Sequence, residues 1–589
     1  MRPPVPTRAL AGHMGSSLFV LMLTTFCLFA TVANALAHGP QRPLAATDAL
    51  LSDSAMALGD MSLVPTASKG SDGASDGAKP MKASRATQTL EDLLDAINVM
   101  QKEYFVLWQG TWPSSIDWTA AVLGTHVAAT LSTLSSTAYH IHSDSVQGLS
   151  LLALENTINY FFSQTSAFYF GENAFSLRNQ AYDDMLWVVL DWLENVKFQD
   201  LHSSLYYSDS NGAPANSSSQ AWYGTQFRDA AAHRARIFYE LASVGWDQTL
   251  CDGGMIWNPT LIPYKNAITN ELFTSASIEM YLYFPGDPID SPFIAAPPSN
   301  KPDQRRRHDP AYLKAAIDAY TWLKNSNMTG VGGLYADGFH ISGWRSATQP
   351  GSRRCDELNT MLYSYNQGVV LSALRGLWLA TGELQYLRDG HDLVRKTLRA
   401  TGWPHLSSDK WAGLGRGGVM EDTCDSHASC SQDGQTFKGI FFHHLAEFCR
   451  PLRPQEAKFL EDQTDESARA QRREDVFTQH LGICRAYGPW VEHNARAALE
   501  TRDADGKFGQ WWGLPFQQKH VSNDMVNSST LPSGADDYRN RKSDTAVTPL
   551  HLRPRDFNDR GRGRTVETQA GGLAVLRALL QWQTSEALS

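Results

Sequence analysis

The chain has 589 residues, a formal net charge of -10, and 42% hydrophobic and 11% aromatic residues. This balance is that of an ordinary globular protein and excludes a chain that is disordered throughout. Acidic residues outnumber basic ones, 61 to 51, so the composition also argues against a nucleic-acid-binding protein. We therefore expect no nucleic acid as a partner.

Residues 1–37 have the pattern of a secretory signal peptide. Two arginines precede an apolar run over residues 18–30, and two small-x-small cleavage patterns follow within residues 33–37. A retained signal anchor is the alternative, although the run falls short of the ~20 residues that a bilayer span needs. The last residues of the chain are polar and do not resemble a GPI signal. The sequence thus predicts a secreted or wall-located protein without a stable membrane anchor.

Cysteine usage supports the same compartment. Besides Cys27 in the signal segment, the sequence contains six cysteines: Cys251, Cys355, Cys424, Cys430, Cys449 and Cys484. An even number predicts disulfides, but the sequence does not choose among the possible pairings. No two of them form a Cys-x-x-Cys pair, so no metal is expected, and no cofactor motif is convincing. Asn216, Asn327 and Asn527 each begin an Asn-x-Ser/Thr acceptor, which favours a glycoprotein.

Residues 38–88 are rich in Ala, Ser, Gly and Asp, and this composition predicts a flexible spacer. Thr89 and Asp92 then resemble a capping box, and the apolar residues that follow have the spacing of an amphipathic helix. We therefore expect one catalytic domain over residues 89–589, beginning with this helix.

Helical periodicity recurs along the rest of the chain, whereas convincing strand patterns are scarce. Further helices are predicted at residues 120–134, 149–162, 185–198, 226–242, 267–283, 312–325, 368–381, 384–400, 436–449, 477–500 and 569–582. Periodicity alone indicates a large all-α domain of about twelve helices, with an array of superhelical repeats as the alternative arrangement. Three polar stretches, at residues 299–309, 453–473 and 522–564, are expected to be insertions outside the helical body.

Asp183 and Asp184 are adjacent carboxylates at the start of an apolar helical run. Glycoside cleavage uses one carboxyl group as general acid and a second as nucleophile or base, about 5–5.5 Å apart in the retaining reaction. Neighbouring side chains at a helix start can converge on a cavity in this way. The alternative is that the two acids cap the first turn of a helix, where negative charge is favoured.

A series of motifs resembles glycoside hydrolase family 76, the endo-α-1,6-mannanases and their fungal cell-wall relatives. In chain order these motifs are Trp112 and Trp118, Tyr182-Asp183-Asp184-Met185-Leu186-Trp187, Gly253-Gly254-Met255-Ile256-Trp257, Tyr264-Lys265-Asn266-Ala267-Ile268-Thr269-Asn270-Glu271-Leu272, Tyr365-Asn366-Gln367-Gly368, Asp433, Phe437-Lys438-Gly439-Ile440-Phe441 and Thr568-Gln569-Ala570-Gly571-Gly572. Their order and spacing fit the family over roughly residues 90–585. The resemblance implies an (α/α)6 toroid in which Asp183 is the nucleophile and Asp184 the acid/base of a retaining reaction.

The resemblance also implies a polysaccharide substrate, an α-1,6-mannan or a mannosylated wall glycan. It places Lys265, Asn266 and Asn270 towards the sugar-binding cavity. Further candidates for substrate contact are Trp118, Trp257, Tyr365, Asn366, Gln367, Asp433 and Lys438. Each has a structural alternative, because amide and ammonium groups can tie loop carbonyls together and aromatic rings can belong to the core.

The sequence therefore predicts a secreted retaining glycoside hydrolase that cleaves α-1,6-mannosidic linkages. One alternative is a transglycosidase that links mannan-bearing glycans to wall glucan through the same two acids. A second is a carbohydrate-binding wall protein that has kept the fold and lost turnover. A damaged acid pair would mark this last case, and here the pair is intact.

Overall fold

The computed structural model describes residues 79–141, 151–166, 180–207, 221–289, 306–406, 409–461, 467–514, 529–540 and 556–587. The predicted signal peptide, most of the predicted spacer, and the acceptors Asn216 and Asn527 lie outside the described residues. The chain divides into two compact units, Met1–Asp76 and Gly77–Ser589, and all described residues belong to the second unit. Helix α3 (Lys79–Tyr104) begins upstream of Thr89, where the first helix was expected.

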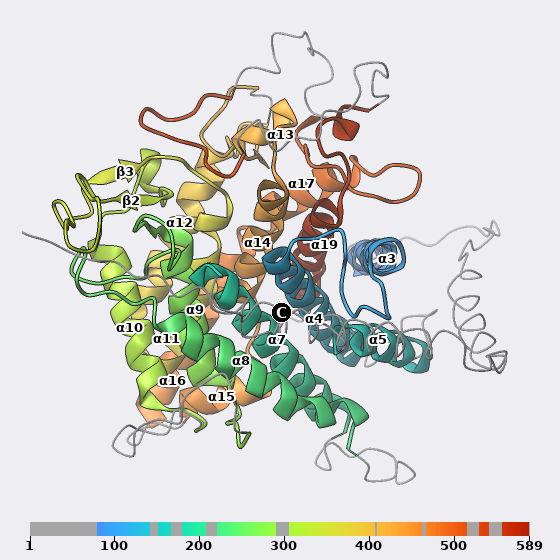
Figure 1. Ribbon diagram of the computed structural model, residues 1–589. Helices are drawn as coiled ribbons and strands as arrows, with labels where there is room; N and C mark the ends of the chain where they lie inside the picture. The colour runs from blue at the N-terminus through green and yellow to red at the C-terminus, as the bar shows by residue number, and fades with distance from the viewer. Residues whose placement is uncertain are drawn as a thin grey trace, which may run out of the picture. The chain divides into compact units, whose positions relative to one another are not determined.

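Six helices pack side by side in a closed ring (Figure 1). Each contacts the next ring helix along the chain, and the last of them, α19, contacts the first, α4. In chain order they are α4 (Asp117–Ile141), α7 (Tyr182–Tyr206), α9 (Ala267–Tyr283), α11 (Val369–Thr381), α14 (Gln432–Cys449) and α19 (Val566–Ala587). Ring helices are enclosed by neighbours; in α9, for example, the side chains from Ala267 to Met280 are all buried.

An outer layer of helices alternates with the ring helices along the chain. Its members are α3, α5 (Leu151–Thr165), α8 (Arg228–Ser243), α10 (Pro310–Asn325), α12 (Leu384–Ala400) and the pair α16 (Ser467–Arg485) and α17 (Gly488–Leu499). Helix α12 shows the pattern expected of this layer, because Leu387, Val394 and Leu398 are buried while charged residues cover its other face. The alternation of six ring helices with an outer layer is an (α/α)6 toroid, which confirms the predicted fold.

Close approach of two ring helices explains the glycines of two sequence motifs. A side chain on Gly439 of α14 would begin 3.1 Å from the backbone of Gly571 in α19. These helices therefore pack backbone against backbone at this point. The glycines of these motifs thus have a packing role.

The strands are short and lie in the loops that precede the ring helices α9, α11 and α14. One antiparallel sheet has the order β1 (Lys265–Asn266), β2 (Gly338–His340), β3 (Glu357–Asn359), with Phe339 of β2 opposite both Lys265 and Leu358. A second pairs β4 (Gly415–Arg416) with β5 (Val419–Met420). The first sheet joins the loop before α9 to the loop before α11, and the second is a hairpin within one loop before α14.

The disulfides pair cysteines that the sequence left unassigned. They are Cys251–Cys355, Cys424–Cys430 and Cys449–Cys484. The first joins the loop before α9 to the loop before α11, so it adds a covalent link between loops that the β1–β2–β3 sheet also connects. Of the helices in the described segments, none has the length and hydrophobicity of a membrane-spanning helix.

The predicted helix at residues 477–500 is two helices, α16 and α17, because Pro489 lies at the start of the second and cannot continue the first. The prediction that residues 453–473 form an external polar insertion is wrong. This stretch contains α15 (Pro454–Glu461), whose Glu456 is fully buried. Its carboxylate binds the guanidinium groups of Arg375 and Arg450, so these charges are neutralised inside the protein.

Candidate active site

The amino-terminal ends of three ring helices meet through hydrogen bonds. Glu567 in the first turn of α19 accepts hydrogen bonds from Thr119 of α4 at 3.1 Å and from Gln432 of α14 at 2.8 Å. The neighbouring first turns carry further carboxylates, Asp117 in α4 and Asp433 in α14. Unpaired backbone N–H groups and the helix dipoles favour negative charge at such ends.

Asp183 and Asp184 occupy the first turn of α7 at this same end. The Asp183 side chain is buried; its Oδ1 accepts a hydrogen bond from the backbone N–H of Asp184 at 3.1 Å, and its Oδ2 lies 3.5 Å from Nη2 of Arg539. Burial raises the pKa of Asp183 to about 6, against the lowering effect of the Arg539 charge and the backbone N–H. Asp183 therefore binds one N–H of the first turn of α7, although no side chain caps this helix, and it also makes an ion pair that stabilising a helix start does not require.

Asp184 has different surroundings. Burial raises its pKa well above the usual range, and the carboxylate of Asp183 raises it further. Asp433 and Asp117 act in the same direction, while Arg539 opposes them. The surroundings of Asp184 thus favour its protonated form, whereas Asp183 has a cation and a backbone N–H that favour its carboxylate form.

Arg539 is a site residue that the sequence analysis missed. It lies in segment 529–540, within the stretch expected to form an external insertion, so that expectation is wrong here. Its guanidinium carbon is 5.1 Å from the centre of the Trp257 ring. Burial opposes its charge, but Tyr365, Asp433, Asp183 and Asp337 raise its pKa well above the usual range. Arg539 and Asp183 are 356 positions apart in the chain, and no local pattern connects them.

Trp257 connects the start of α7 to the loop before α9. Its backbone carbonyl accepts a hydrogen bond from the Tyr182 N–H at 2.9 Å. The Trp257 indole is also among the groups that lower the pKa of Asp183. Trp257 therefore lies against the acid pair and against Arg539.

Lys265, Asn266 and Asn270 hold this loop and the start of α9. The buried Lys265 Nζ donates to four backbone carbonyls of residues 247–254, among them those of Leu250 at 2.7 Å and Gly254 at 3.0 Å. The Asn270 side chain pairs with both backbone groups of Met255, and Asn266 caps α9. The contacts of these three side chains are thus with the protein itself, which matches the structural alternative weighed from the sequence.

The glycine pair of the same motif is required by its conformation. Gly253 and Gly254 have φ angles of 136° and 87°, in the region that favours glycine. Both lie against the ring of Trp322, and a Cβ on Gly254 would be 2.6 Å from it. A larger residue would push this loop, and with it Trp257, away from the acid pair.

Tyr365, Asn366 and Gln367 form the short helix η4 (Tyr365–Gln367) before α11. Tyr365 stacks on Phe437 with ring centres 4.0 Å apart, and its electrostatic neighbours include Asp183 and Arg539. Within the described segments, the buried Tyr365 hydroxyl and both polar atoms of the Asn366 amide have no hydrogen-bond partner. Gln367 instead binds the backbone N–H and carbonyl of Tyr335, each at 2.9 Å. Tyr365 and Asn366 therefore keep unused hydrogen-bonding groups within the described structure.

The remaining predicted site residues lie in two places: Trp118 and Asp433 are close to the acid pair, and Lys438 is in a different cluster. Trp118 is buried, stacks on Trp187 and donates its indole N–H to Asp433 Oδ1 at 2.9 Å, so it orients a carboxylate that acts on Asp184. Lys438 Nζ pairs with Asp425 Oδ2 at 2.6 Å in another buried cluster. Lys438 thus supports the loops around α14.

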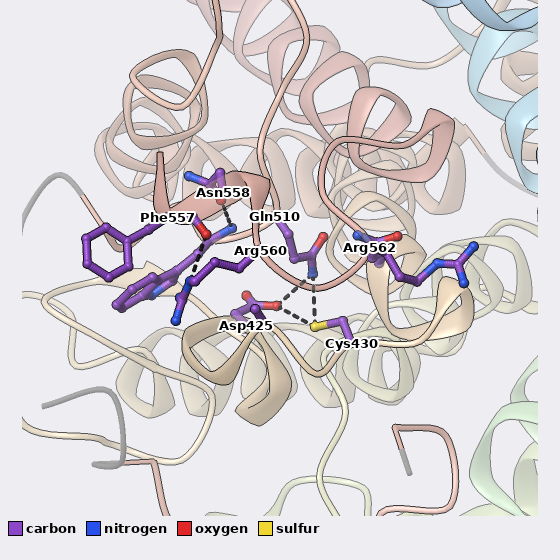
Figure 2. Close-up of a pocket in the computed structure, with 10 residues that line it drawn as sticks. Asp425, Cys430, Gln510, Phe557, Asn558, Arg560 and Arg562 are labelled. Carbon is purple, nitrogen blue, oxygen red and sulfur yellow. Dashed lines mark hydrogen bonds between the residues drawn. The ribbon is translucent and has the colours of Figure 1, made fainter. Parts of the chain in front are cut away.

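A pocket next to Asp425 is lined by residues of these loops (Figure 2). Its polar groups bind one another: Gln510 donates to Asp425 at 2.6 Å, and Arg560 donates to the Phe557 carbonyl at 3.0 Å. These contacts hold the loops together.

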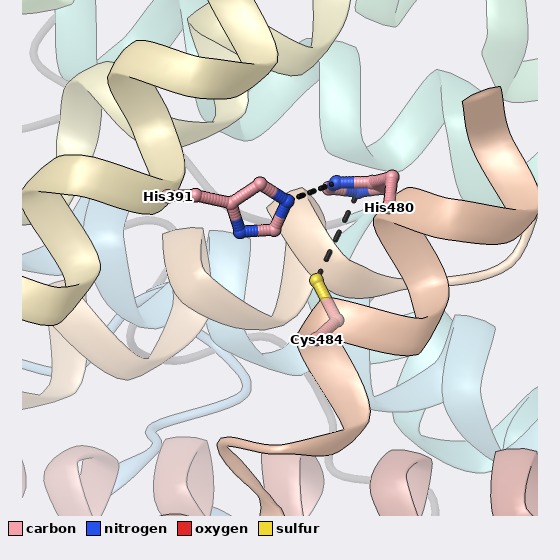
Figure 3. Close-up of side chains that lie close together, drawn as sticks. All are labelled: His391, His480 and Cys484. Atoms are coloured by element: carbon pink, nitrogen blue, oxygen red, sulfur yellow. Dashed lines mark hydrogen bonds between the residues drawn. The ribbon is translucent and has the colours of Figure 1, made fainter.

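Two clusters have the residue types of a metal site. His391, His480 and Cys484 lie together, and Nε2 of His391 is 2.9 Å from Nδ1 of His480 (Figure 3). Cys484 is bonded to Cys449, and the cysteines of the other cluster, Cys424 and Cys430, are bonded to each other. The thiolates that would bind a metal are therefore used in disulfides.

Comparison with known proteins finds a family match within the helical domain. Residues 304–506 match the model of glycosyl hydrolase family 76, a range that includes α10 to α17 and excludes Asp183 and Asp184. A comparison with curated proteins gives no match.

Several solved structures align over most of the chain. The α-1,6-mannanase GH76A of Salegentibacter sp. is 16% identical, with 84% of this chain and 98% of that one covered and a TM-score of 0.43. Dfg5 of Chaetomium thermophilum, solved with glucosamine, is 14% identical, with 86% and 91% covered and a TM-score of 0.46. The family 76 mannosidase Bt3792 of Bacteroides thetaiotaomicron is 13% identical, with 85% and 100% covered and a TM-score of 0.46.

The match to the family model confirms the resemblance that the sequence motifs indicated. Residues 304–506 of the chain are thus similar to glycosyl hydrolase family 76.

Proposed function

We propose that this protein is a secreted retaining glycoside hydrolase that cleaves α-1,6-mannosidic linkages in mannan. The observation that carries the proposal is the unequal surroundings of two adjacent carboxyl groups. Asp183 has a guanidinium group and a backbone N–H beside it, whereas Asp184 faces the carboxylates of Asp117 and Asp433. Two acids whose surroundings separate their pKa values can serve as ionised nucleophile and protonated acid at one pH.

In the first step, the carboxylate of Asp183 attacks the anomeric carbon of a bound mannose residue. Asp184 gives its proton to the glycosidic oxygen, the bond between that oxygen and the anomeric carbon breaks, and the leaving glycan departs as an alcohol. A mannosyl ester on Asp183 remains. Because attack comes from the face opposite the leaving group, this step inverts the anomeric configuration.

In the second step, Asp184 is a carboxylate and accepts a proton from water as the water oxygen attacks the anomeric carbon. The ester bond to Asp183 breaks, and both acids return to their starting states. A second inversion restores the α configuration. A sugar hydroxyl in place of water would give transglycosylation by the same step.

A neutral glycan suits the polar groups that this end of the toroid leaves available. The Tyr365 hydroxyl and the Asn366 amide can exchange hydrogen bonds with sugar hydroxyls without a charged substrate. The indole of Trp257 adds an aromatic surface next to the acids. The α-1,6-mannan specificity itself is the expectation from family resemblance, and the experiment below tests it.

The test compares α-1,6-mannooligosaccharides with α-1,2-, α-1,3- and β-1,4-linked ones, using the wild type, Asp183→Asn and Asp184→Asn. We expect only the α-1,6 substrate to be cleaved, an initial α product by NMR of the anomeric proton, and no turnover by either variant. Asp200→Asn is the matched control, because Asp200 lies on the same helix and pairs with Arg228 instead. Initial β product would refute the retaining assignment, and near-native activity of either acid variant would refute its role.

Two further outcomes identify the alternatives. Excess β-glucan acceptor is added to labelled substrate and the products are sized. Label mainly in larger hybrid glycans would indicate a transglycosidase. Binding of α-1,6-mannooligosaccharide without any turnover would indicate a carbohydrate-binding protein.

A further inference from the structure

Segment 529–540, here called the strap, brings Arg539 to the acid pair from a distant part of the sequence. We propose that Arg539 is a positioning residue that makes Asp183, and not Asp184, the ionised nucleophile, and that the strap is built to hold it there. This inference rests on the proposed function and adds a residue that determines how the two acids divide their roles.

The strap is fastened to the body of the domain at several points. At β3, the Asn359 amide donates to the Asp536 carbonyl at 2.8 Å and accepts from the Asp536 N–H at 2.8 Å. Further along, the Tyr363 hydroxyl donates to Asp537 at 2.6 Å. The strap is therefore tied to the loop that leads into η4 and Tyr365.

The end of the strap is tied to the ring itself. Asn540 is buried, and its Oδ1 accepts a hydrogen bond at 2.8 Å from the backbone N–H of Ser431, the residue that caps α14. Asp537 in turn accepts from the Asn540 backbone at 3.0 Å. Arg539 is thus flanked by two anchored residues, and its position is determined by the same helix end that carries Asp433.

The guanidinium group of Arg539 is directed at one member of the acid pair. It lies between the Trp257 ring, at 5.1 Å, and Asp183 Oδ2, at 3.5 Å, and its side chain is 21% exposed. A cation at this position favours the carboxylate form of Asp183 more than that of Asp184, which it does not contact directly.

Among the residues that the structure describes, the other charged or titratable groups around the pair are acids. Asp184 itself lies on α7, Asp117 on α4, Tyr365 on η4, Asp433 on α14, and Asp337 beside β2. Each of these groups, when negative, opposes ionisation of Asp183. Without Arg539 the two adjacent carboxyl groups would share a proton more evenly, and a smaller fraction of the protein would have the nucleophile ionised.

The experiment compares Arg539→Gln and Arg539→Lys with Arg502→Gln. Arg502 is a matched control, because it also pairs with an aspartate, Asp92 at 2.8 Å, and its side chain is 27% exposed. For Arg539→Gln we expect the acidic limb of the kcat/KM profile to move up by about one pH unit or more, with kcat down roughly 10–100-fold. Arg539→Lys should lie between this variant and the wild type, and Arg502→Gln should match the wild type.

A second strap variant tests whether support of Arg539 matters. Tyr363→Phe removes one hydrogen bond of the strap and keeps Arg539, so we expect a smaller shift of the acidic limb in the same direction. An unmoved acidic limb in Arg539→Gln and Arg539→Lys, with melting temperatures near the wild type, would overturn the inference.

A measurement without turnover separates this inference from the proposed function. In the Asp184→Asn background, infrared difference spectra with labelled aspartate report the pH at which Asp183 ionises. We expect that pH to be higher in the Asp184→Asn/Arg539→Gln double variant; an equal pH in both would overturn the inference. If the wild type cleaves no glycan but this shift is present, the proposed function fails and the action of Arg539 on Asp183 stands.

Discussion

Replacing Asp183 by Asn is expected to remove activity and at the same time stabilise the protein at neutral pH. The Asp183 carboxyl is 3% exposed, and burial raises its pKa from 3.8 to about 6. The folded protein therefore binds this proton more tightly than the unfolded chain does. By linkage, stability is highest below pH 3.8 and falls as the pH rises through the interval up to about 6, above which the whole penalty is present.

The size of the effect follows from the shift. Two pKa units correspond to ~3 kcal/mol at 25 °C. Asparagine has no charge to bury, so Asp183→Asn should gain up to this amount at pH 7.5 and almost nothing at pH 4; the attraction of Asp183 to Arg539 is already included in the pKa of about 6. For a domain of this size, 1 kcal/mol moves the melting temperature by roughly 1 °C. We expect a rise of ~1–3 °C at pH 7.5.

The assay is thermal melting at pH 4 and pH 7.5 beside turnover of α-1,6-mannooligosaccharide, which should fall ~10⁴-fold or more if Asp183 is the nucleophile. Asp200 lies on the same helix as Asp183 and forms a partly exposed ion pair with Arg228 of α8. Asp200→Asn should therefore change the melting temperature by less than ~1 °C and leave turnover unchanged. A melting temperature lowered equally at both pH values would refute the reasoning, because it would mean that the hydrogen bond to the Asp184 N–H, and thus helix capping, is the main role of Asp183.

Three further predictions concern pH, the interior and the loop before α9. The kcat/KM profile should rise through about pH 6 as Asp183 ionises and fall again at higher pH as the general acid loses its proton; a flat profile down to pH 4 would contradict the assignment. Glu456→Gln should destabilise the protein by ~3–5 kcal/mol in chemical denaturation at pH 7, because it leaves the buried guanidinium group of Arg375 without its carboxylate partner and Arg450 with Glu447 alone; a variant as stable as the wild type would show that Arg375 finds another partner. Lys265→Met should lower melting temperature and activity together, since unsatisfied loop carbonyls cost ~1–3 kcal/mol each; lost activity with normal melting would instead indicate that Lys265 contacts substrate.

Local patterns were sufficient for much of the helical architecture. Helices α9 and α12 have the predicted bounds, 267–283 and 384–400, and α9 begins directly after the capping residue Asn266. The predicted single helix over 477–500 failed at Pro489, although the proline itself was a visible signal for a break. Helix α15 was missed because its charged residues read as solvent-exposed, whereas Glu456 is buried among arginines that come from other helices.

In the site, too, local features could be predicted from the sequence and long-range contacts could not. The acid pair was recognisable because its position at a helix start is a local property, and α7 begins at Tyr182, directly before it. The contact of Arg539 with Asp183 depends on how a long loop returns to the ring, and periodicity contains no information about that path. For Lys265 and Asn270, the residue types fitted a ligand role and a structural role equally well, and only the backbone groups that they contact distinguish the two.

Closure of the ring by α19 has a consequence for how the chain matures. This helix packs against α4, α14 and α3, so it fills the gap between the first and the last-but-one members of the ring. Among the described helices it is translated last, and until it emerges from the ribosome Gly439 of α14 lacks its backbone contact with Gly571. Glu567, which links the starts of α4 and α14, is also absent until then. The nascent chain therefore cannot assemble the acid-bearing end of the toroid helix by helix during translation; that end is completed in one late step, when α19 docks.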